Sequence, residues 1–298
     1  MKKILLLLTI VAMACNVAYA KGSTNAEDDL AEALALLQKG DTSRGLKLLK
    51  KTAHDGYAPA LNHLAYLYLN GAKCIDKNES LAAQCYGLSA DQEDDDGLCG
   101  LAYCYLNGLG VRKNETKAVE LFTQAAKQSN SDAYMRLAMC YSEGRGVRRD
   151  LQRAFNWWML AAGQENPEAW YQLARCYGEG LGVKPDQGRA VQWLTQAADA
   201  GHADAQHALA LRYYEGRGVK KSEQRAVQLW KQSAEQGNAD AQFCLGECYE
   251  QGEGVKADAS LARHYYNLAA AQGDRESQQA LNRLKKAQQQ SQPRKKRR

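Results

Sequence analysis

The chain has 298 residues, 45% of them hydrophobic, and a formal net charge of +5. This length would permit two ordinary domains. The charge lies at the two ends, because Lys2, Lys3 and the five basic residues at 294–298 account for more than all of it. Without these seven cations, 32 basic and 34 acidic residues remain, so the sequence excludes a folded body with the basic surface that nucleic-acid binding needs.

The N-terminus has the layout of a secretory signal peptide. Two lysines precede an apolar run at residues 4–14, which is too short to span a bilayer because a spanning helix needs about 20 residues. An Ala-Tyr-Ala motif ends at Ala20, so we predict a signal peptide over residues 1–20 that is cleaved after Ala20. A lipoprotein signal that uses Cys15 is the alternative. The sequence therefore predicts a periplasmic or secreted protein, with no transmembrane segment further along the chain.

Residues 21–57 are predicted to form a capping pair of helices. Leu30, Ala33, Leu34 and Leu37 recur at helical spacing in the first helix, and a second stripe begins at Leu46. Such a diverged terminal pair is typical of an array of repeats, whose end must be covered.

Residues 58–273 repeat with a period of 36. The first half of each repeat carries Ala, Leu and Tyr at helical spacing, and a Gly-x-Gly-Val turn follows it in five repeats. The second half is again helical in its spacing, and a glycine such as Gly237 ends it. One helix pair cannot bury its own apolar face, so six repeats are predicted to stack into an all-α solenoid without a sheet. The recurring tyrosines are Tyr68, Tyr105, Tyr141, Tyr177, Tyr213 and Tyr249.

The repeat resembles the Sel1-like repeat family, which is related to tetratricopeptide repeats. Residues 205–219, AQHALALRYYEGRGV, are similar to the family's first-helix signature, and residues 226–237, AVQLWKQSAEQG, are similar to its second. The first repeat departs from the pattern, with Gly-Ala-Lys-Cys at residues 71–74 in place of Gly-x-Gly-Val. The resemblance implies a right-handed α/α solenoid of helix-turn-helix repeats and a scaffold for other proteins.

The C-terminal end is predicted to be a capping helix and a tail. Residues 274–288 read as a single helix in which Ala280, Leu281 and Leu284 cover the last repeat. Residues 289–298 are predicted to be a disordered basic tail. Three roles for the tail stay open: contact with an anionic surface, nuclear import in a host cell, or none. Its charged residues are Arg294, Lys295, Lys296, Arg297 and Arg298.

No motif predicts catalysis, a metal or a cofactor. The motifs Ser-x-x-Lys and Gly-x-Ser-x-Gly do not occur in the sequence. The five histidines are scattered, without a His-x-His or His-Glu-x-x-His pattern, and His202 and His207 are spaced poorly for a shared ligand site. Each glycine pair follows a predicted helix rather than a strand, which favours a turn over a phosphate-binding loop.

Four cysteines immediately precede a repeat tyrosine. Equivalent sites in stacked repeats should lie about 8–10 Å apart, whereas a disulfide needs Cα atoms within about 7 Å. These cysteines are therefore predicted to be small buried side chains, while a bridge of Cys85 with Cys99 or Cys104 stays open. The four are Cys104, Cys140, Cys176 and Cys248.

Cysteine-rich relatives of the Sel1-like family have been described as β-lactamases or penicillin binders, with one disulfide in each repeat. In this chain alanines, such as Ala162, hold the corresponding position at the end of the second helix. The resemblance therefore favours a scaffold, and a β-lactam-binding or β-lactam-hydrolysing enzyme is an alternative. A secreted effector that contacts a host cell is the third hypothesis.

A binding groove is predicted on the first helices, which line the concave face of tetratricopeptide-like solenoids. Two columns four residues apart vary between repeats and are rich in aromatic, Met and Arg side chains, which are common at interface centres. A more acidic rim column runs beside them, from Asn70 and Asn107 to Glu143 and Glu179. We predict that the groove binds a protein or peptide partner, in extended or helical form, although these side chains could instead pack against the second helices. The predicted contact residues are Tyr66, Tyr103, Met135, Met139, Tyr171, Arg175, His207, Phe243 and Glu247.

Overall fold

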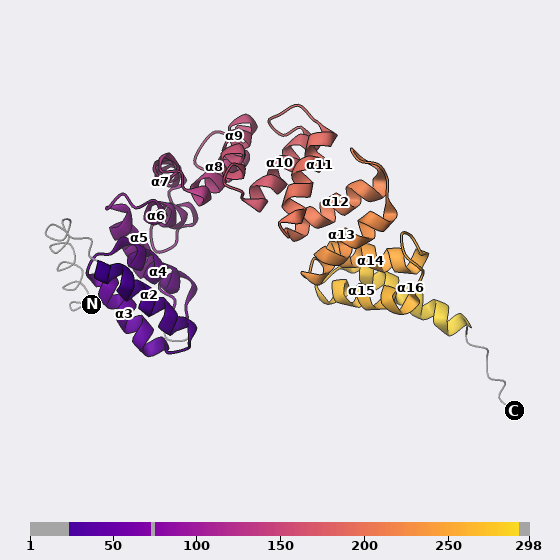
Figure 1. Cartoon of the computed structure of the whole chain (residues 1–298), viewed down its shortest axis with the longest axis horizontal. Coiled ribbons are helices and arrows are strands. Elements are labelled where there is room, and N and C mark those ends of the chain that lie inside the picture. Colours follow the sequence, from indigo (N-terminus) through magenta and orange to yellow (C-terminus); the bar gives the residue numbers. More distant parts are fainter. Residues whose placement is uncertain (1–23, 73–74, 292–298) are drawn as a thin grey trace. The chain divides into compact units, whose positions relative to one another are not determined.

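The structure is a computed structural model that describes residues 24–72 and 75–291 (Figure 1). The predicted signal peptide, Cys74 and the basic residues at 294–298 lie outside the described residues. The described residues form helices α2 to α16, and the single extended pairing among them is a bridge between Ala72 and Ile75. The prediction of an all-α solenoid without a sheet is therefore confirmed.

The chain divides into two compact units, and the division falls between Trp157 and Trp158. Helix α9 (Leu151–Ala162) contains this boundary. The helices of unit 1 are α2 (Thr24–Gln38), α3 (Thr42–His54), α4 (Ala58–Asn70), α5 (Glu79–Ala90), α6 (Asp95–Asn107), α7 (Glu115–Lys127) and α8 (Ser131–Glu143). Those of unit 2 are α10 (Pro167–Glu179), α11 (Gln187–Asp199), α12 (Ala203–Glu215), α13 (Glu223–Glu235), α14 (Ala239–Gln251), α15 (Ala259–Ala271) and α16 (Arg275–Ser291).

Unit 1 is a run of helices in which each packs against the next along the chain, from α2 to α8. The first helices of neighbouring repeats also meet, as α4 and α6 do. The core consists largely of alanine, leucine and a few large side chains, including Phe122 and Leu137, which are fully buried. Alanines let the helices approach closely, so small and large side chains alternate through the unit.

Unit 2 follows the same plan from α10 to α16. Its largest fully buried side chains are Trp230 and Tyr266, both on second helices. Of the tryptophans on second helices, Trp158 and Trp230 are buried and Trp193 is half-buried.

The glycine turns fix how one repeat meets the next. The first glycine of each pair ends the first helix in the left-handed conformation, as Gly144 does after α8. The second glycine, Gly146, also has a positive φ, of 71°. A Cβ atom on Gly146 would collide with the carbonyl oxygen of Glu115 at the start of α7. The turn therefore requires glycine both for its backbone angle and for the close contact between repeats.

The C-terminal helix is longer than the sequence pattern predicts. Helix α16 ends at Ser291, so the prediction that it ends at residue 288 and that a disordered tail starts at 289 is wrong for residues 289–291. The glutamines at 288–290 are good helix formers, and the first residue that opposes a helix is Pro293. Ala280 is buried in one core cluster with residues of α14 and α15, as predicted, and Leu281 and Leu284 are partly buried beside it.

The cysteines of the described residues are free thiols. The four that precede the repeat tyrosines are buried, which confirms their predicted packing role. Cys85 and Cys99 are half-buried and form no bridge in the structure, with each other or with Cys104.

Candidate binding site on the first helices

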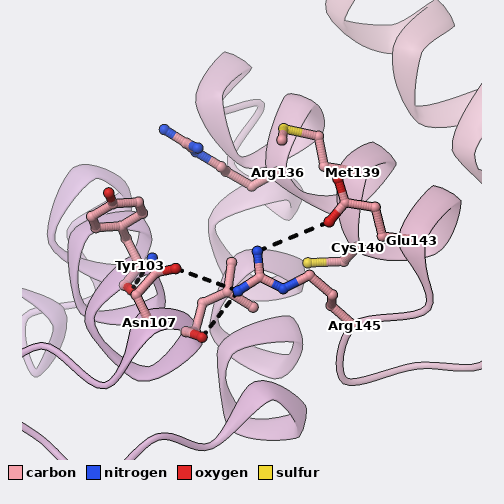
Figure 2. A pocket seen from close by; sticks show the side chains of 8 residues that line it. Tyr103, Asn107, Arg136, Met139, Cys140, Glu143 and Arg145 are labelled. Atoms are coloured by element: carbon pink, nitrogen blue, oxygen red, sulfur yellow. Dashed lines mark hydrogen bonds and ion pairs between the residues drawn. The ribbon is translucent and has the colours of Figure 1, made fainter.

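Helices α6 and α8 are first helices of neighbouring repeats, and together with the loop after α8 they form a shallow pocket of about 200 Å³ (Figure 2). Met139 is 39% exposed in this pocket. The lining residues are Tyr103, Leu106, Asn107, Arg136, Met139, Cys140, Glu143 and Arg145.

Arg145 closes one side of the pocket and is fully engaged. Its Nη2 donates hydrogen bonds to the carbonyl oxygen of Leu106 at 3.2 Å and to Oδ1 of Asn107 at 3.3 Å. Its Nε lies 3.5 Å from a carboxylate oxygen of Glu115, and its Nη1 lies 4.0 Å from one of Glu143, so two acids balance its charge. Arg145 therefore ties α6, α7 and α8 together, and the dashed lines of Figure 2 mark several of these contacts.

Arg136 differs from Arg145 because it forms no ion pair, although Asp132 precedes it by about one turn of α8. Its guanidinium lies over the ring of Tyr103, with 5.1 Å between Cζ and the ring centroid. Within residues 24–72 and 75–291, no hydrogen bond or ion pair to Arg136 is present. In Figure 2 its side chain extends away from Arg145, on the side of the pocket where Tyr103 lies. The pocket thus offers one uncompensated cation beside an aromatic ring and a methionine.

The thiols at this face are poor nucleophiles. Burial raises the pKa of Cys140 to about 11 and that of Cys99 to about 12. Burial likewise raises the pKa of Cys176 and of Cys248 to about 12. Because the thiolate is the reactive form, these cysteines are neutral and unreactive near pH 7.

The predicted contact residues of unit 1 fall into two groups. Tyr103 and Met139 line the pocket, and Tyr66 on α4 is 60% exposed. Met135 was predicted as a contact residue, and this is wrong because it is only 8% exposed and packs inward on α8 with Tyr134 and Leu137. The exposed face of α8 lies one position further along the chain, at residues 136, 139 and 143.

In unit 2 most predicted contact residues interact with neighbouring side chains. Arg175 forms an ion pair of 3.6 Å with Glu179 and donates a hydrogen bond to Gln172. Tyr171 stacks on His202 with ring centroids 5.1 Å apart.

The other three are partly buried. Phe243 packs against Tyr266, with ring centroids 5.9 Å apart. Burial lowers the pKa of His207, whose Nδ1 has no hydrogen-bond partner in the structure. Burial and the nearby Glu276 raise the pKa of Glu247.

His202 is the N-terminal cap of α12, and it occupies a position that asparagine holds elsewhere. Its Nδ1 accepts a hydrogen bond from the backbone N–H of Ala205, and its Nε2 lies 2.8 Å from a carboxylate oxygen of Glu168. Asn130 and Asn238 make the same two kinds of contact at the starts of α8 and α14. The caps therefore join each of these first helices to the one before it.

Sequence reasoning missed Arg136, Leu106, Cys140 and Arg145 as lining residues. Arg136 could have been found from its spacing, since residues 136, 139 and 143 share one face of a helix. Arg145 could not, because a loop residue has no such periodicity.

The described residues show neither a metal-site arrangement nor a membrane-spanning helix. No group of three or more His, Cys, Asp or Glu side chains there is arranged to hold a metal ion. No helix there combines the length and the apolar character that crossing a membrane requires.

Comparison with protein-family models decides the family. The Sel1 repeat model matches six consecutive segments, at residues 58–94, 95–130, 131–166, 167–202, 203–238 and 239–274. The chain belongs to the Sel1 repeat family. The predicted family is therefore confirmed. Sel1 repeats build scaffolds that typically mediate interactions between proteins. No curated protein matches the chain.

Two solved structures of Sel1-type proteins resemble the chain. One is c5321, a protective antigen present in uropathogenic Escherichia coli strains, with 30% identity and a TM-score of 0.75. The match covers 93% of this chain but only 59% of c5321, so the chain spans less than two thirds of that relative. The other is a Sel1 repeat protein from Oxalobacter formigenes, with 28% identity, a TM-score of 0.71 and coverage of 81% of this chain and 96% of that one.

Proposed function

We propose that this Sel1 repeat protein is a non-enzymatic scaffold that binds a protein or peptide partner through the exposed face of its first helices. The observation that carries the proposal is the pocket between α6 and α8, where Tyr103, Met139 and Arg136 are available together. Aromatic, methionine and arginine side chains are enriched at the centres of protein interfaces. A flexible methionine adapts to different apolar partners, and a tyrosine offers a large rigid surface.

We also propose that the protein works outside the cytoplasm, in the bacterial envelope or beyond it. The signal-peptide pattern at residues 1–20 supports this location. The similarity to c5321, a protective antigen, supports it further. The basic residues at 294–298 would add attraction to an anionic surface, and this attraction should weaken as salt concentration rises.

A capture experiment tests the scaffold function. The chain from Lys21 onward, which contains every described residue, is immobilised and exposed to an envelope extract beside two variants. The first, Tyr103→Ala/Met139→Ala, removes the apolar side chains of the pocket. The matched control, Leu261→Ala/Leu268→Ala, removes two similarly exposed apolar side chains from the second helix α15.

A partner that the pocket variant loses and the control retains would support the proposal. A partner that both variants retain would place the binding site elsewhere, and capture of no partner would count against a scaffold. The non-enzymatic assignment has its own test, which is hydrolysis of nitrocefin by the purified chain. Turnover that one residue change abolishes would contradict it.

A further inference from the structure

The uncompensated charge of Arg136 indicates the chemistry of the partner. We propose that Arg136 binds the side-chain carboxylate of an aspartate or glutamate in a partner peptide, and that a neighbouring apolar side chain of the same peptide packs on Met139. This inference rests on the proposed scaffold function, because it specifies what the pocket between α6 and α8 recognises.

Arg136 differs from Arg145 in its own unit and from Arg175 in unit 2. Arg145 is held by two carboxylates and a carbonyl, and Arg175 by Glu179 and Gln172. Within the described part of the chain Arg136 has only the ring of Tyr103. A carboxylate of a ligand would give this guanidinium the ion-pair partner that it lacks within the described residues.

The contact with Tyr103 favours a planar, bidentate ligand. The guanidinium of Arg136 lies over the Tyr103 ring, and no hydrogen bond within the described residues uses its N–H groups, so these donors are available to a ligand. A carboxylate matches two of these N–H groups at once, which gives shorter and stronger hydrogen bonds than a neutral acceptor. Tyr103 thus orients the charge for its ligand as well as lining the pocket.

The residues around Arg136 also set the order of groups in the peptide. Met139 follows Arg136 by about one helical turn on α8, and Glu143 follows Met139 by another turn. Glu143 repels a carboxylate at that end, and Asp132, one turn before Arg136, repels one at the other end, so the acidic residue of the peptide should lie at Arg136 itself. Alternate residues of an extended peptide are about 7 Å apart on one side, so the acidic and apolar residues should lie within two positions of each other.

Peptide selection tests this inference with a defined probe. A phage library of random linear 12-residue peptides is selected on the chain from Lys21 onward, and the tightest peptides are synthesised with a fluorescent label. Affinities are then measured by fluorescence anisotropy on the wild type, on Arg136→Gln and Arg136→Lys, and on the control Arg175→Gln. Each peptide is also measured with its acidic residue replaced by the corresponding amide.

We expect enrichment of peptides with Asp or Glu within two positions of an apolar residue. Arg136→Gln should weaken binding about tenfold or more, Arg136→Lys less, and Arg175→Gln less than about twofold. The amide peptide should bind weakly to the wild type and about equally to Arg136→Gln, because the two changes remove the same contact. Unchanged circular dichroism and thermal unfolding check that the variants fold.

The alternative results separate the two proposals. Peptides that bind wild type and Arg136→Gln equally, but lose affinity for Tyr103→Ala/Met139→Ala, would overturn the carboxylate contact and leave the scaffold function intact. Failure to select any peptide would overturn both. If Arg136→Gln alone fails to fold, Arg136→Lys decides. The inference is overturned if this variant binds the acidic peptide and the amide peptide with full affinity.

Discussion

The face of α6 and α8 in unit 1 and the face of α10 in unit 2 use similar residues with different results. Each carries a tyrosine and an arginine, but Arg136 in unit 1 has only Tyr103 beside it, whereas Arg175 in unit 2 is paired with Glu179. Tyr171 of unit 2 stacks on His202. The two arginines hold different positions of the repeat, and only Arg175 has an acid one turn away with which it forms an ion pair. Residue type alone does not define a binding site, because the local partners decide which groups remain available.

The largest expected effect concerns the glycine that positions the Arg145 loop in unit 1. Gly146→Ala places a Cβ against the carbonyl oxygen of Glu115 and forces alanine to a φ of 71°. We expect a loss of about 2–4 kcal/mol in the free energy of unfolding, measured by urea denaturation. The control is Gly87→Ala in α5, where an added Cβ meets no atom within 4 Å, and it should stabilise by about 0.5–1 kcal/mol. An equal effect of the two changes would contradict the close contact between repeats.

The next effect compares the helix caps of the two units. Asn130 caps α8 through the backbone N–H of Ala133 and donates hydrogen bonds to Asp95 and Asp96. Asn130→Ala removes the cap and leaves Asp96, whose pKa is already raised by burial, without that donor. We expect a loss of about 2 kcal/mol in the free energy of unfolding, measured by thermal and urea denaturation. Asn130→Asp keeps the cap acceptor but adds a third carboxylate, so it should also destabilise, and more at pH 8 than at pH 4.

The equivalent cap in unit 2 should make stability depend on pH. The hydrogen bond to Glu168 raises the pKa of His202 above its usual 6.5, and the same contact lowers the pKa of Glu168. The protonated histidine therefore stabilises the fold below about pH 6.5, and this contribution is lost as pH rises through the raised pKa. Glu168 contributes above its unfolded-state pKa of about 4.3, so the charged pair is strongest between these limits.

The matched variant is His202→Asn, which can cap α12 and donate to Glu168 at any pH, as Asn238 does for Asp204. Relative to it, the wild type should lose less than about 1 kcal/mol between pH 5.5 and 8, measured by urea denaturation at both pH values. The change is small because Glu168 is partly exposed and because a proton on Nδ1 breaks the cap bond to Ala205. A pH-independent difference would show that His202 does not take up a proton in this range.

The fold was largely predictable from the sequence, and the site only in part. A 36-residue period with alanines at fixed places indicates helix pairs that cannot fold alone, which is why the six repeats and the buried cysteines were correct. Of the predicted contact columns, Tyr103 and Met139 line the pocket, but the columns placed the exposed face of α8 one residue early, at Met135. Spacing fixes which residues share a face, while the direction of that face depends on the packing of neighbouring helices.

The pairing of the arginines could not be predicted in the same way. Arg175 and Glu179 are four residues apart, so their ion pair is visible in the sequence. Arg136 lies four residues after Asp132, yet no ion pair between them is formed, while the loop residue Arg145 engages Glu115 of α7 and Glu143 of α8. Whether a surface charge is paired depends on all the repeats around it, and sequence spacing predicts only the pairs within one helix.

The smallest expected effect comes from a change that would leave unit 2, like unit 1, with an arginine that has no ion pair. Glu179→Gln removes the counter-charge of Arg175 and leaves an arginine next to Tyr171 on α10. The free energy of unfolding should fall by only about 0.3–0.5 kcal/mol, because an exposed pair four residues apart on a helix contributes little. When it is added to Arg136→Gln, the same change should raise the affinity for an acidic peptide about two- to threefold above that of Arg136→Gln alone, measured by fluorescence anisotropy at low salt. The gain should disappear when salt screens the charge, which separates it from apolar contacts. If no affinity returns, an unpaired arginine is not sufficient, and the shape of the pocket between α6 and α8 must carry the selectivity as well.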